Sequence, residues 1–468
     1  MEQTYDAIVL GTGLKEGILS ALLSVHGKKV LHMDRNKYYG GDCASLRLTQ
    51  LYEFFNEDPA TIPKNFGKDG DWNVDMIPKF ILASGDLMKT LTHADCLMYL
   101  DFGKVAGSFV YSKNEIQKVP STVKEALTSK LMGLFEKKRM GSFLQDINDY
   151  LYNNKPMKLD PTKCTCSELF DSYKFEPGTR EFLLHAMALQ TNDMALRQVA
   201  LPILEKIQLY GASTQRYGSS PYIYPIYGLG DIPQAFARLS AVWGGTYMLD
   251  KQVDEILIND GKVEGVRCGD EKVYSKIVIG DPSYFPDLVQ SVGKVGRGIC
   301  ILQGAIKRCV DQSDQEKDQD GNLIQHTSAQ IIIPGSQCDR DDDIYVTTQG
   351  FNHRTTPKNL CIGFVSGQVQ GNDQKELKAG FELLNQAGIL KSFYRTTDIY
   401  VPKPEAKDMN IFISKSYDAT SHFESTIKDA LEMYTLISGE VLDLNSKIQR
   451  PQPQQVPPIQ EVTENVEE

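Results

Sequence analysis

Residues 5–17 read Tyr-Asp-Ala-Ile-Val-Leu-Gly-Thr-Gly-Leu-Lys-Glu-Gly, and residues 28–34 read Lys-Lys-Val-Leu-His-Met-Asp. The apolar run 7–10 ends at a glycine, which is typical of a parallel strand that is covered on both faces. Apolar residues at helical spacing follow in 18–25, and residues 30–33 form a second apolar run. The stretch therefore predicts a strand, a glycine turn, a helix and a second strand.

The same stretch carries most of a dinucleotide-binding fingerprint. In that fingerprint the N–H groups of a glycine turn hold a diphosphate, and an acidic residue ending the second strand binds the ribose hydroxyls. Gly11, Gly13 and Asp34 match it, but Glu16 stands where the third glycine belongs. A carboxylate there competes with the diphosphate for the same positive helix end. We expect a fold that retains the unit without its ligand, with a working dinucleotide site as the alternative.

Bulk composition restricts the class of protein. The 468 residues are 41% hydrophobic and 24% charged, which suits a soluble protein of two domains. A net charge of −11 argues against a nucleic-acid partner, since binding phosphates needs a basic face. The nine scattered cysteines indicate free thiols in the cytosol and no metal site. No signal peptide or run of about 18 apolar residues is evident, so no membrane span is predicted.

Periodicity divides the chain into a sheet domain and an inserted helical domain. Strand patterns dominate residues 1–118 and 219–447, which we expect to form one discontinuous sheet domain. Helical patterns follow one another through 119–218 and predict an all-helical domain. The tail 448–468, rich in proline and glutamine, is expected to be disordered.

Individual elements can be placed within these domains. A candidate capping box at Thr122 and Glu125 begins the helical domain, and a glycine turn at 227–230 predicts a later helix that ends at Gly244. A last helix is expected at 427–437, and the charged stretch 311–327 is expected to be a loop. The predicted strands are 104–111, 115–119, 253–258, 262–267, 272–274, 277–279, 299–306, 329–333, 344–348 and 360–365.

This organisation is an α/β architecture of the FAD-oxidoreductase type. It combines a Rossmann-type βαβ unit with an inserted all-helical domain and a later helix that a glycine turn opens. Organisation alone therefore makes an amine-oxidase-like flavoenzyme one hypothesis for function. Such an enzyme has to hold the diphosphate of its flavin at the first turn, and Glu16 stands against that requirement.

Short segments spread over nearly the whole chain match one known family. They read Ile8-Val-Leu-Gly-Thr-Gly-Leu14, Lys28-Lys-Val-Leu-His-Met-Asp-Arg-Asn36, Tyr38-Tyr-Gly-Gly41, Asp71-Trp-Asn-Val-Asp75, Ile77-Pro-Lys-Phe80, Leu131-Met-Gly-Leu-Phe-Glu-Lys137, Arg216-Tyr-Gly218, Ser220-Pro-Tyr222, Tyr227-Gly-Leu-Gly230, Gly245-Thr-Tyr-Met-Leu249, Asp281-Pro-Ser-Tyr284 and Ser416-Tyr-Asp418. With these segments the sequence resembles the Rab GDP-dissociation inhibitors, which share their architecture with the longer Rab escort proteins. The resemblance is to full-length members.

The resemblance implies a flavoprotein-like fold that is used for protein binding, without a cofactor or catalysis. Members of the family bind geranylgeranylated Rab GTPases in the GDP state and slow GDP release. They extract these GTPases from membranes and carry them in the cytosol for vesicle-traffic recycling. The implied partners are a GDP-bound prenylated Rab in a 1:1 complex, its geranylgeranyl lipid and, transiently, a membrane surface. An escort protein that presents GTPases to a prenyltransferase is a further alternative.

Two groups of site residues follow from the resemblance. The family's Rab-binding platform corresponds to Tyr39, Asp231, Gln234, Arg238, Thr246 and Met248. Tyr, Arg and Met suit such a surface because they combine apolar area with directed polar contacts. From the pattern alone, Arg238 would be a helix-surface residue and Met248 a core residue. The family's mobile effector loop, linked to membrane recruitment, corresponds to Arg216, Tyr217, Ser220 and Tyr222.

The prenyl group sets a further requirement. Twenty carbons at about 0.8 kcal/mol per buried CH₂ favour an apolar site over water by on the order of 10 kcal/mol. The helical domain is the natural place for that site, because apolar stripes between helices can part to admit a chain. The expected lining residues are Leu131, Phe135, Phe143, Ile147, Leu183 and Met187. Packing in an ordinary helical core is the competing interpretation for each of them.

Overall fold

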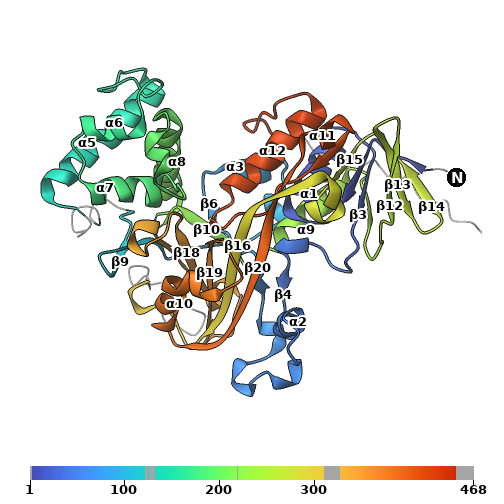
Figure 1. The fold of residues 1–468 in the computed structure, drawn as a ribbon, viewed down its shortest axis with the longest axis horizontal. Helices are drawn as coiled ribbons and strands as arrows, with labels where there is room; N and C mark the ends of the chain where they lie inside the picture. The colour runs from blue at the N-terminus through green and yellow to red at the C-terminus, as the bar shows by residue number, and fades with distance from the viewer. Residues whose placement is uncertain (1–2, 122–124, 126–131, 219, 310–326, 449–468) are drawn as a thin grey trace, which may run out of the picture.

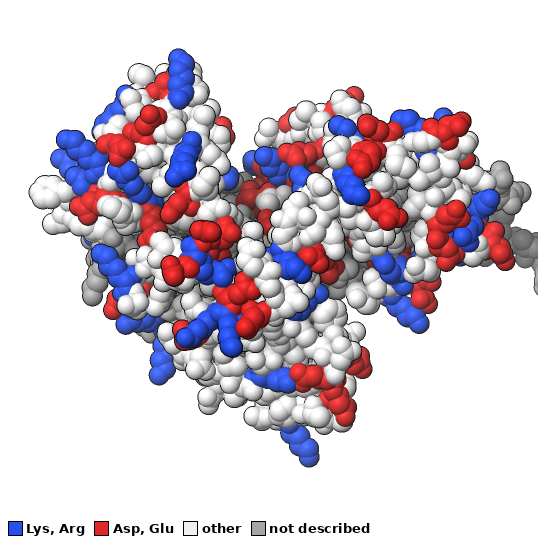
Figure 2. Space-filling view, in the orientation of Figure 1, with Lys and Arg blue, Asp and Glu red and all other residues white. Residues whose placement is uncertain are grey.

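The computed structural model describes residues 3–121, 125, 132–218, 220–309 and 327–448. Figure 1 shows a group of helices standing to one side of a larger body built of sheets. Figure 2 shows a notch in the outline between these two parts, and acidic and basic side chains interspersed over both. Among the helices of the described residues, none is long and apolar enough to cross a bilayer.

A five-stranded parallel sheet is built around the N-terminal strand–helix–strand unit. Its strands run in the order β11-β3-β2-β15-β21. Their bounds are Ala7–Leu10 for β2, Val30–Met33 for β3, Thr246–Met248 for β11, Val278–Gly280 for β15 and Ile411–Ile413 for β21. Helices α1 (Leu14–Val25), α9 (Asp231–Val242) and α12 (Glu424–Ser438) accompany the sheet, and α1 packs on both others. The predicted N-terminal unit is confirmed, as is the helix that follows the second glycine turn.

A seven-stranded sheet forms the other large layer, in the order β20-β16-β19-β18-β17-β8-β9. The strands span Gly107–Ser112 (β8), Glu115–Lys118 (β9), Val289–Leu302 (β16), Ala329–Ile333 (β17), Ile344–Gly350 (β18), Cys361–Val369 (β19) and Ile389–Pro402 (β20). Helix α10 (Lys378–Asn385) packs on this sheet. The sequence did not predict β20, and it placed the start of β16 at residue 299 instead of Val289.

Small sheets and short helices fill the space around these layers. A four-stranded sheet contains β1 (Gln3–Thr4), β14 (Glu271–Tyr274), β13 (Lys262–Cys268) and β12 (Glu255–Asn259). A three-stranded sheet contains β6 (Ile81–Leu82), β10 (Tyr222–Pro225) and β7 (Phe102–Lys104). The last sheet pairs β4 (Ser45–Leu46) with β5 (Val74–Asp75). The short helices are α2 (Leu48–Phe54), α3 (Asp86–His93) and α11 (Pro404–Asp408). The predicted strand 104–111 is therefore divided between β7 and β8.

The helical segment contains α5 (Leu134–Asn153), α6 (Cys166–Ser172), α7 (Pro177–Glu181), a π-helix (Phe182–Met187) and α8 (Leu201–Tyr217). Its core is aromatic: the ring of Phe143 lies edge-on to Phe170, Tyr173 and Phe175 at centroid distances of 5.8, 4.8 and 5.2 Å. Such edge-to-face pairs add to the energy of apolar burial. Thr122, the first residue of the predicted capping box, lies outside the described residues.

A buried histidine joins the helical segment to the seven-stranded sheet. Nδ1 of His185 lies 2.7 Å from Oδ2 of Asp343, which directly precedes β18, and its Nε2 lies 3.1 Å from Oδ1 of Asp193. Burial alone would lower the pKa of His185, but the two carboxylates outweigh it and raise the pKa to about 9. The imidazole is therefore charged at neutral pH and bridges the two parts.

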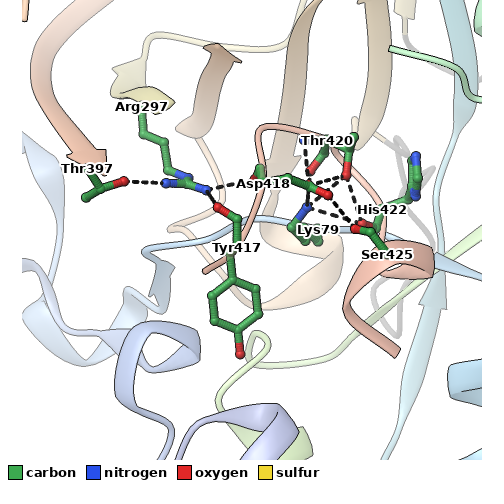
Figure 3. Close-up of polar contacts among 8 residues, drawn as sticks. All are labelled: Lys79, Arg297, Thr397, Tyr417, Asp418, Thr420, His422 and Ser425. Carbon is green, nitrogen blue, oxygen red and sulfur yellow. Dashed lines mark hydrogen bonds and ion pairs between the residues drawn. The ribbon is translucent and has the colours of Figure 1, made fainter. Parts of the chain in front are cut away.

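A second buried cluster fixes the C-terminal segment against the sheets (Figure 3). Nζ of Lys79 donates to Oδ1 of Asp418 at 2.6 Å and to Oγ1 of Thr420 at 2.9 Å. Nη2 of Arg297 donates to the carbonyl oxygens of Tyr417 and Asp418 at 2.9 and 2.8 Å. Burial opposes ionisation of Asp418, but the Lys79 ammonium and nearby hydroxyls hold the pKa of this carboxyl well below its usual range. Figure 3 shows the ring of Tyr417 projecting away from the cluster.

Candidate functional site

One exposed face of α9 forms a shallow depression of about 430 Å³. Asp231, Gln234 and Arg238 lie three and four residues apart, so their side chains share that face. Tyr39 reaches the same depression from the segment that follows β3. Four of the six predicted platform residues are therefore brought together, although Tyr39 is far from the other three in the sequence.

A second depression, of about 560 Å³, adjoins the first and shares Tyr39, Asp231 and Gln234 with it. Arg47 and Tyr227 line its other side. Burial raises the pKa of Asp231, and Nε2 of Gln234 donates to the carbonyl oxygen of Gly230 at 3.0 Å. The two depressions form one continuous surface around the N-terminal turns of α9. We call this surface the α9 surface.

The other two predicted platform residues lie on the strand that follows α9. Thr246 and Met248 belong to β11, the edge strand of the five-stranded sheet, and neither lines the two depressions. Met248 is 41% exposed, so the pattern-based interpretation of this residue as core is wrong. Arg238 is exposed, as the pattern indicated.

Sequence reasoning missed two tyrosines of the α9 surface. The ring of Tyr99 lies beneath Arg238, whose guanidinium carbon is 4.6 Å from the ring centroid. The ring of Tyr247 lies between His32 and Tyr39, at centroid distances of 4.6 and 6.1 Å. Burial raises the pKa of Tyr247 to about 12. Alternation along β11 could have identified Tyr247, because it must point opposite to its two neighbours.

The predicted effector-loop residues do not lie in one loop. Arg216 and Tyr217 end α8, where Nη1 of Arg216 donates to the carbonyl oxygen of Ala83 at 2.7 Å and Tyr217 is 46% exposed. Ser220 is buried, and Tyr222 is a buried residue of β10 that pairs with Leu82. The expectation of a loop is therefore wrong for Arg216 and Tyr217, which belong to a helix, and for Tyr222, which belongs to a strand of the three-stranded sheet.

The predicted prenyl-pocket residues are mostly core residues in this structure. Phe143, Ile147, Leu183 and Met187 are buried and pack with the other apolar side chains of the helical segment. Phe135, in the first turn of α5, is 82% exposed, and Leu131 lies outside the described residues. Four of the six residues therefore lie between helices, as the sequence predicted, and they fill that space with their own side chains.

The predicted fingerprint residues line a third cavity, of about 460 Å³, at the glycine turn. Asp34 is buried, and its Oδ2 accepts hydrogen bonds from the N–H and the hydroxyl of Thr12 at 2.7 and 2.6 Å. Glu16 is buried in the first turn of α1, and its Oε1 accepts from Ser414 at 2.6 Å. Burial raises the pKa of Glu16 to about 7, against the opposing charge of Lys15.

The residues of this cavity do not fit the diphosphate of a dinucleotide. A Cβ added to Gly13 would lie 2.5 Å from Oε2 of Glu16, and a Cβ added to Gly11 would lie 2.5 Å from Oδ2 of Asp281. Two carboxylates thus occupy the space above the glycine turn, where a diphosphate would need room and positive potential. The oxygen atoms of Asp34 that would bind ribose already accept hydrogen bonds from this chain.

The fold and the filled glycine turn define a flavoenzyme-like scaffold with carboxylates in the place of the cofactor's diphosphate. An oxidoreductase from Methanosarcina mazei has the same fold, with 13% identity and a TM-score of 0.55 over 92% of this chain and 99% of that one. The chain belongs to the GDP dissociation inhibitor family, whose model matches residues 1–449. It therefore belongs to a family of regulators, not of enzymes.

Individual relatives are similar along nearly their whole length. A guanosine nucleotide diphosphate dissociation inhibitor of Arabidopsis thaliana is 48% identical over 95% of this chain and 97% of the relative. The Rab GDP dissociation inhibitor beta of Rattus norvegicus is 43% identical over 95% and 97%. The crystal structure of a Rab GDI from Plasmodium falciparum is 41% identical, covers 95% of this chain and 100% of that one, and has a TM-score of 0.85.

Proposed function

We propose that this chain acts as a Rab GDP-dissociation inhibitor: it binds Rab GTPases in the GDP state, slows GDP release and carries the prenylated GTPase between membranes. Family membership over residues 1–449 is the observation that carries this proposal. The α9 surface supports it, because tyrosines, arginines and glutamines gather there around two depressions. Aromatic and arginine side chains are enriched where protein interfaces carry most of their binding energy.

Selectivity for the GDP state follows from the mobility of the GTPase. Switch segments that lack contacts with a γ-phosphate can adopt the shape that fits a preformed surface, and the bound state then shifts their population. The α9 surface is preformed in this sense, because the ring of Tyr247 packs between His32 and Tyr39. A partner held in this way has to release the surface before its nucleotide can leave.

We assign the binding site for the prenyl lipid to the helical segment. Phe143, Ile147, Leu183 and Met187 fill the space between its helices, so a lipid chain would have to part these side chains. The π-helix Phe182–Met187 carries two of them, and π-helical turns are frequent at functional sites. Arg216 and Tyr217, at the end of α8, are the residues we assign to contact with the membrane or a recruitment factor.

A membrane-release assay tests this function. Membranes that carry a prenylated Rab loaded with GDP are incubated with the purified chain and sedimented, and Rab in the supernatant is quantified. We expect stoichiometric release with GDP-loaded Rab and little release with Rab that carries a non-hydrolysable GTP analogue. Absence of release in both cases, together with a flavin absorbance band in the protein, would replace the proposal with a flavoenzyme.

A further inference from the structure

A buried carboxylate lies directly beneath the turn that begins α9. Asp75 is fully buried in β5, opposite Ser45 of the neighbouring strand β4. Oδ1 of Asp75 accepts a hydrogen bond from Oγ of Ser45 at 2.5 Å and another from the N–H of Leu229 at 2.9 Å. Oγ of Ser45 in turn accepts from the N–H of Gly230 at 2.9 Å. Two consecutive backbone N–H groups of the turn are thus fixed by this pair.

The other oxygen of the carboxylate is held from a third element. Oδ2 of Asp75 accepts from the hydroxyl of Tyr224, a fully buried residue of β10. The Tyr224 ring lies edge-on to Phe80 and His353, at centroid distances of 5.3 and 5.5 Å. The carboxylate therefore links β4, β5 and β10 to the start of α9.

The turn is shaped to approach these two side chains closely. Gly228 has φ +98°, and a Cβ added to it would lie 2.5 Å from Oγ of Ser45 and 3.0 Å from Oδ1 of Asp75. A Cβ added to Gly230 would lie 3.0 Å from the backbone nitrogen of Ser45. Glycine at both positions is thus explained by this contact and not only by turn geometry.

We propose that Asp75 and Ser45 are positioning residues of the GTPase-binding surface: they hold the turn 227–230 and so set where Asp231 and Gln234 stand. Asp75 is fully buried, so it acts without touching the partner, whereas Ser45 is half-buried and lines the second depression. Asp231 is the first residue of α9, directly after Gly230, and Gln234 lies one turn further along. A shift of the turn is thus passed on to both side chains. The inference rests on the proposed function.

Hydrogen bonding, not ion pairing, defines the role of the carboxylate. Burial raises the pKa of Asp75 to about 6, and the hydroxyls of Ser45 and Tyr224 and the Leu229 N–H oppose this rise. Fixed donors around a buried acceptor give a single geometry, because any displaced donor would be left unsatisfied. This arrangement suits a device that positions a surface turn.

The test compares three variants of the full chain. Ser45→Ala removes the link between Asp75 and the Gly230 N–H, and Asp75→Asn keeps one acceptor oxygen but replaces the other with a donor. Ser414→Ala is the matched control, because it also removes a serine hydroxyl that donates to a carboxylate, here that of Glu16, and Ser414 does not line the α9 surface. Binding of GDP-loaded Rab is titrated, and hydrogen exchange is measured at the amides of Leu229 and Gly230.

We expect Ser45→Ala to weaken Rab binding by about tenfold and to accelerate exchange at Gly230. Asp75→Asn is expected to weaken binding by a smaller factor, and Ser414→Ala to match the wild-type chain in both measurements. The positioning role would be overturned if the Gly230 amide of Ser45→Ala exchanged at the wild-type rate. It would also be overturned if that amide exchanged faster while the affinity for Rab stayed unchanged. If the wild-type chain itself binds no Rab, the proposed function fails, while the exchange rates still test the contact between Ser45 and the turn.

Discussion

At the scale of single residues, Arg238 is an exposed side chain of the α9 surface that suits substitution. Its guanidinium packs on the ring of Tyr99. We expect Arg238→Glu to weaken binding of GDP-loaded Rab by about tenfold or more, because arginine in an interface centre commonly carries this much energy. The free energy of unfolding should change by less than about 1 kcal/mol, as is usual for an exposed site.

Isothermal titration and urea unfolding of the same samples check this prediction. Lys272→Glu is the matched control, since it makes the same change of charge at an exposed position of β14 in the four-stranded sheet. Affinity equal to that of the control would remove Arg238 from the binding surface.

Substitution of Glu16 is expected to raise the free energy of unfolding. Its pKa is raised by burial to about 7 from an ordinary value of 4.5, so the stability it contributes is fully present below pH 4.5 and is lost as the pH rises through 7. Glu16→Gln has no charge to bury and escapes that loss. At pH 8 we expect the variant to unfold with a free energy about 1 to 3 kcal/mol higher than the wild-type chain, and at pH 4.5 we expect no difference.

Urea titrations at the two pH values measure this difference. Glu382→Gln, at an exposed position of α10, serves as the control that should show no such pH dependence. A Glu16→Gln variant that is less stable than the wild-type chain at pH 8 would show that the ionised carboxylate stabilises the turn.

Single residues also show what the sequence could and could not predict about the site. The platform residues come from family motifs, and the fold brings four of them together at the α9 surface. Tyr99 was missed because its contribution depends on packing between distant segments. The apolar pattern of the helical segment locates Phe143 and Ile147 correctly as buried, but it cannot distinguish a lipid site from a core.

At the scale of elements, His185 provides the joint between the π-helix and the strand β18. The raised pKa means that its stabilising charge is fully present below pH 6.5 and is lost as the pH rises through about 9. We expect His185→Gln to lower the free energy of unfolding by about 3 kcal/mol at pH 6, because Asp343 then stays buried without its charged partner. The loss should shrink by pH 10, where the wild-type imidazole is neutral.

Denaturation curves at the two pH values, followed by circular dichroism, measure this effect. His26→Gln is a suitable comparison, because His26 is exposed at the end of α1. Its ring contacts the ring of Tyr434, and among the described residues it forms no ion pair with a carboxylate. An equal loss at both pH values would mean that His185 contributes only through neutral hydrogen bonds.

The elements that the sequence predicted are those whose residues are either fully buried or clearly alternate between buried and exposed. The strand Ala7–Leu10 is buried at every position, and its continuous apolar run is unambiguous. Strand β20 was missed because nearly all of its residues are only partly buried, so neither face shows clean alternation. The part of β16 before residue 299 mixes valines with polar residues and glycines, and only the buried end of the strand, 299–302, lay in the predicted strand. Pairing of these two long strands, a tertiary effect, stabilises both.

At the scale of the whole molecule, the proposed protein surface and the proposed lipid site lie on different parts of the chain. The α9 surface belongs to the body of sheets, whereas the lipid is assigned to the helical segment that Figure 1 shows to one side. Distant sites with no shared contacts usually contribute additively. Prenylation of Rab and the Arg238→Glu change should therefore alter the binding free energy independently, to within about 0.5 kcal/mol.

A double cycle measures this independence: the two forms of the chain are each titrated with prenylated and unprenylated GDP-loaded Rab. A coupling energy well above about 0.5 kcal/mol would show that lipid and protein surfaces act through a common change of shape.

The proposed function requires this flavoenzyme-like scaffold to recognise the nucleotide state of a GTPase. The ratio of dissociation constants for one unprenylated Rab, loaded with GDP and with a non-hydrolysable GTP analogue, measures this recognition. We predict at least about tenfold tighter binding of the GDP form, which corresponds to about 1.4 kcal/mol of difference between the two states. Equal affinity for the two forms, or tighter binding of the GTP form, would show that the chain is not a GDP-state inhibitor.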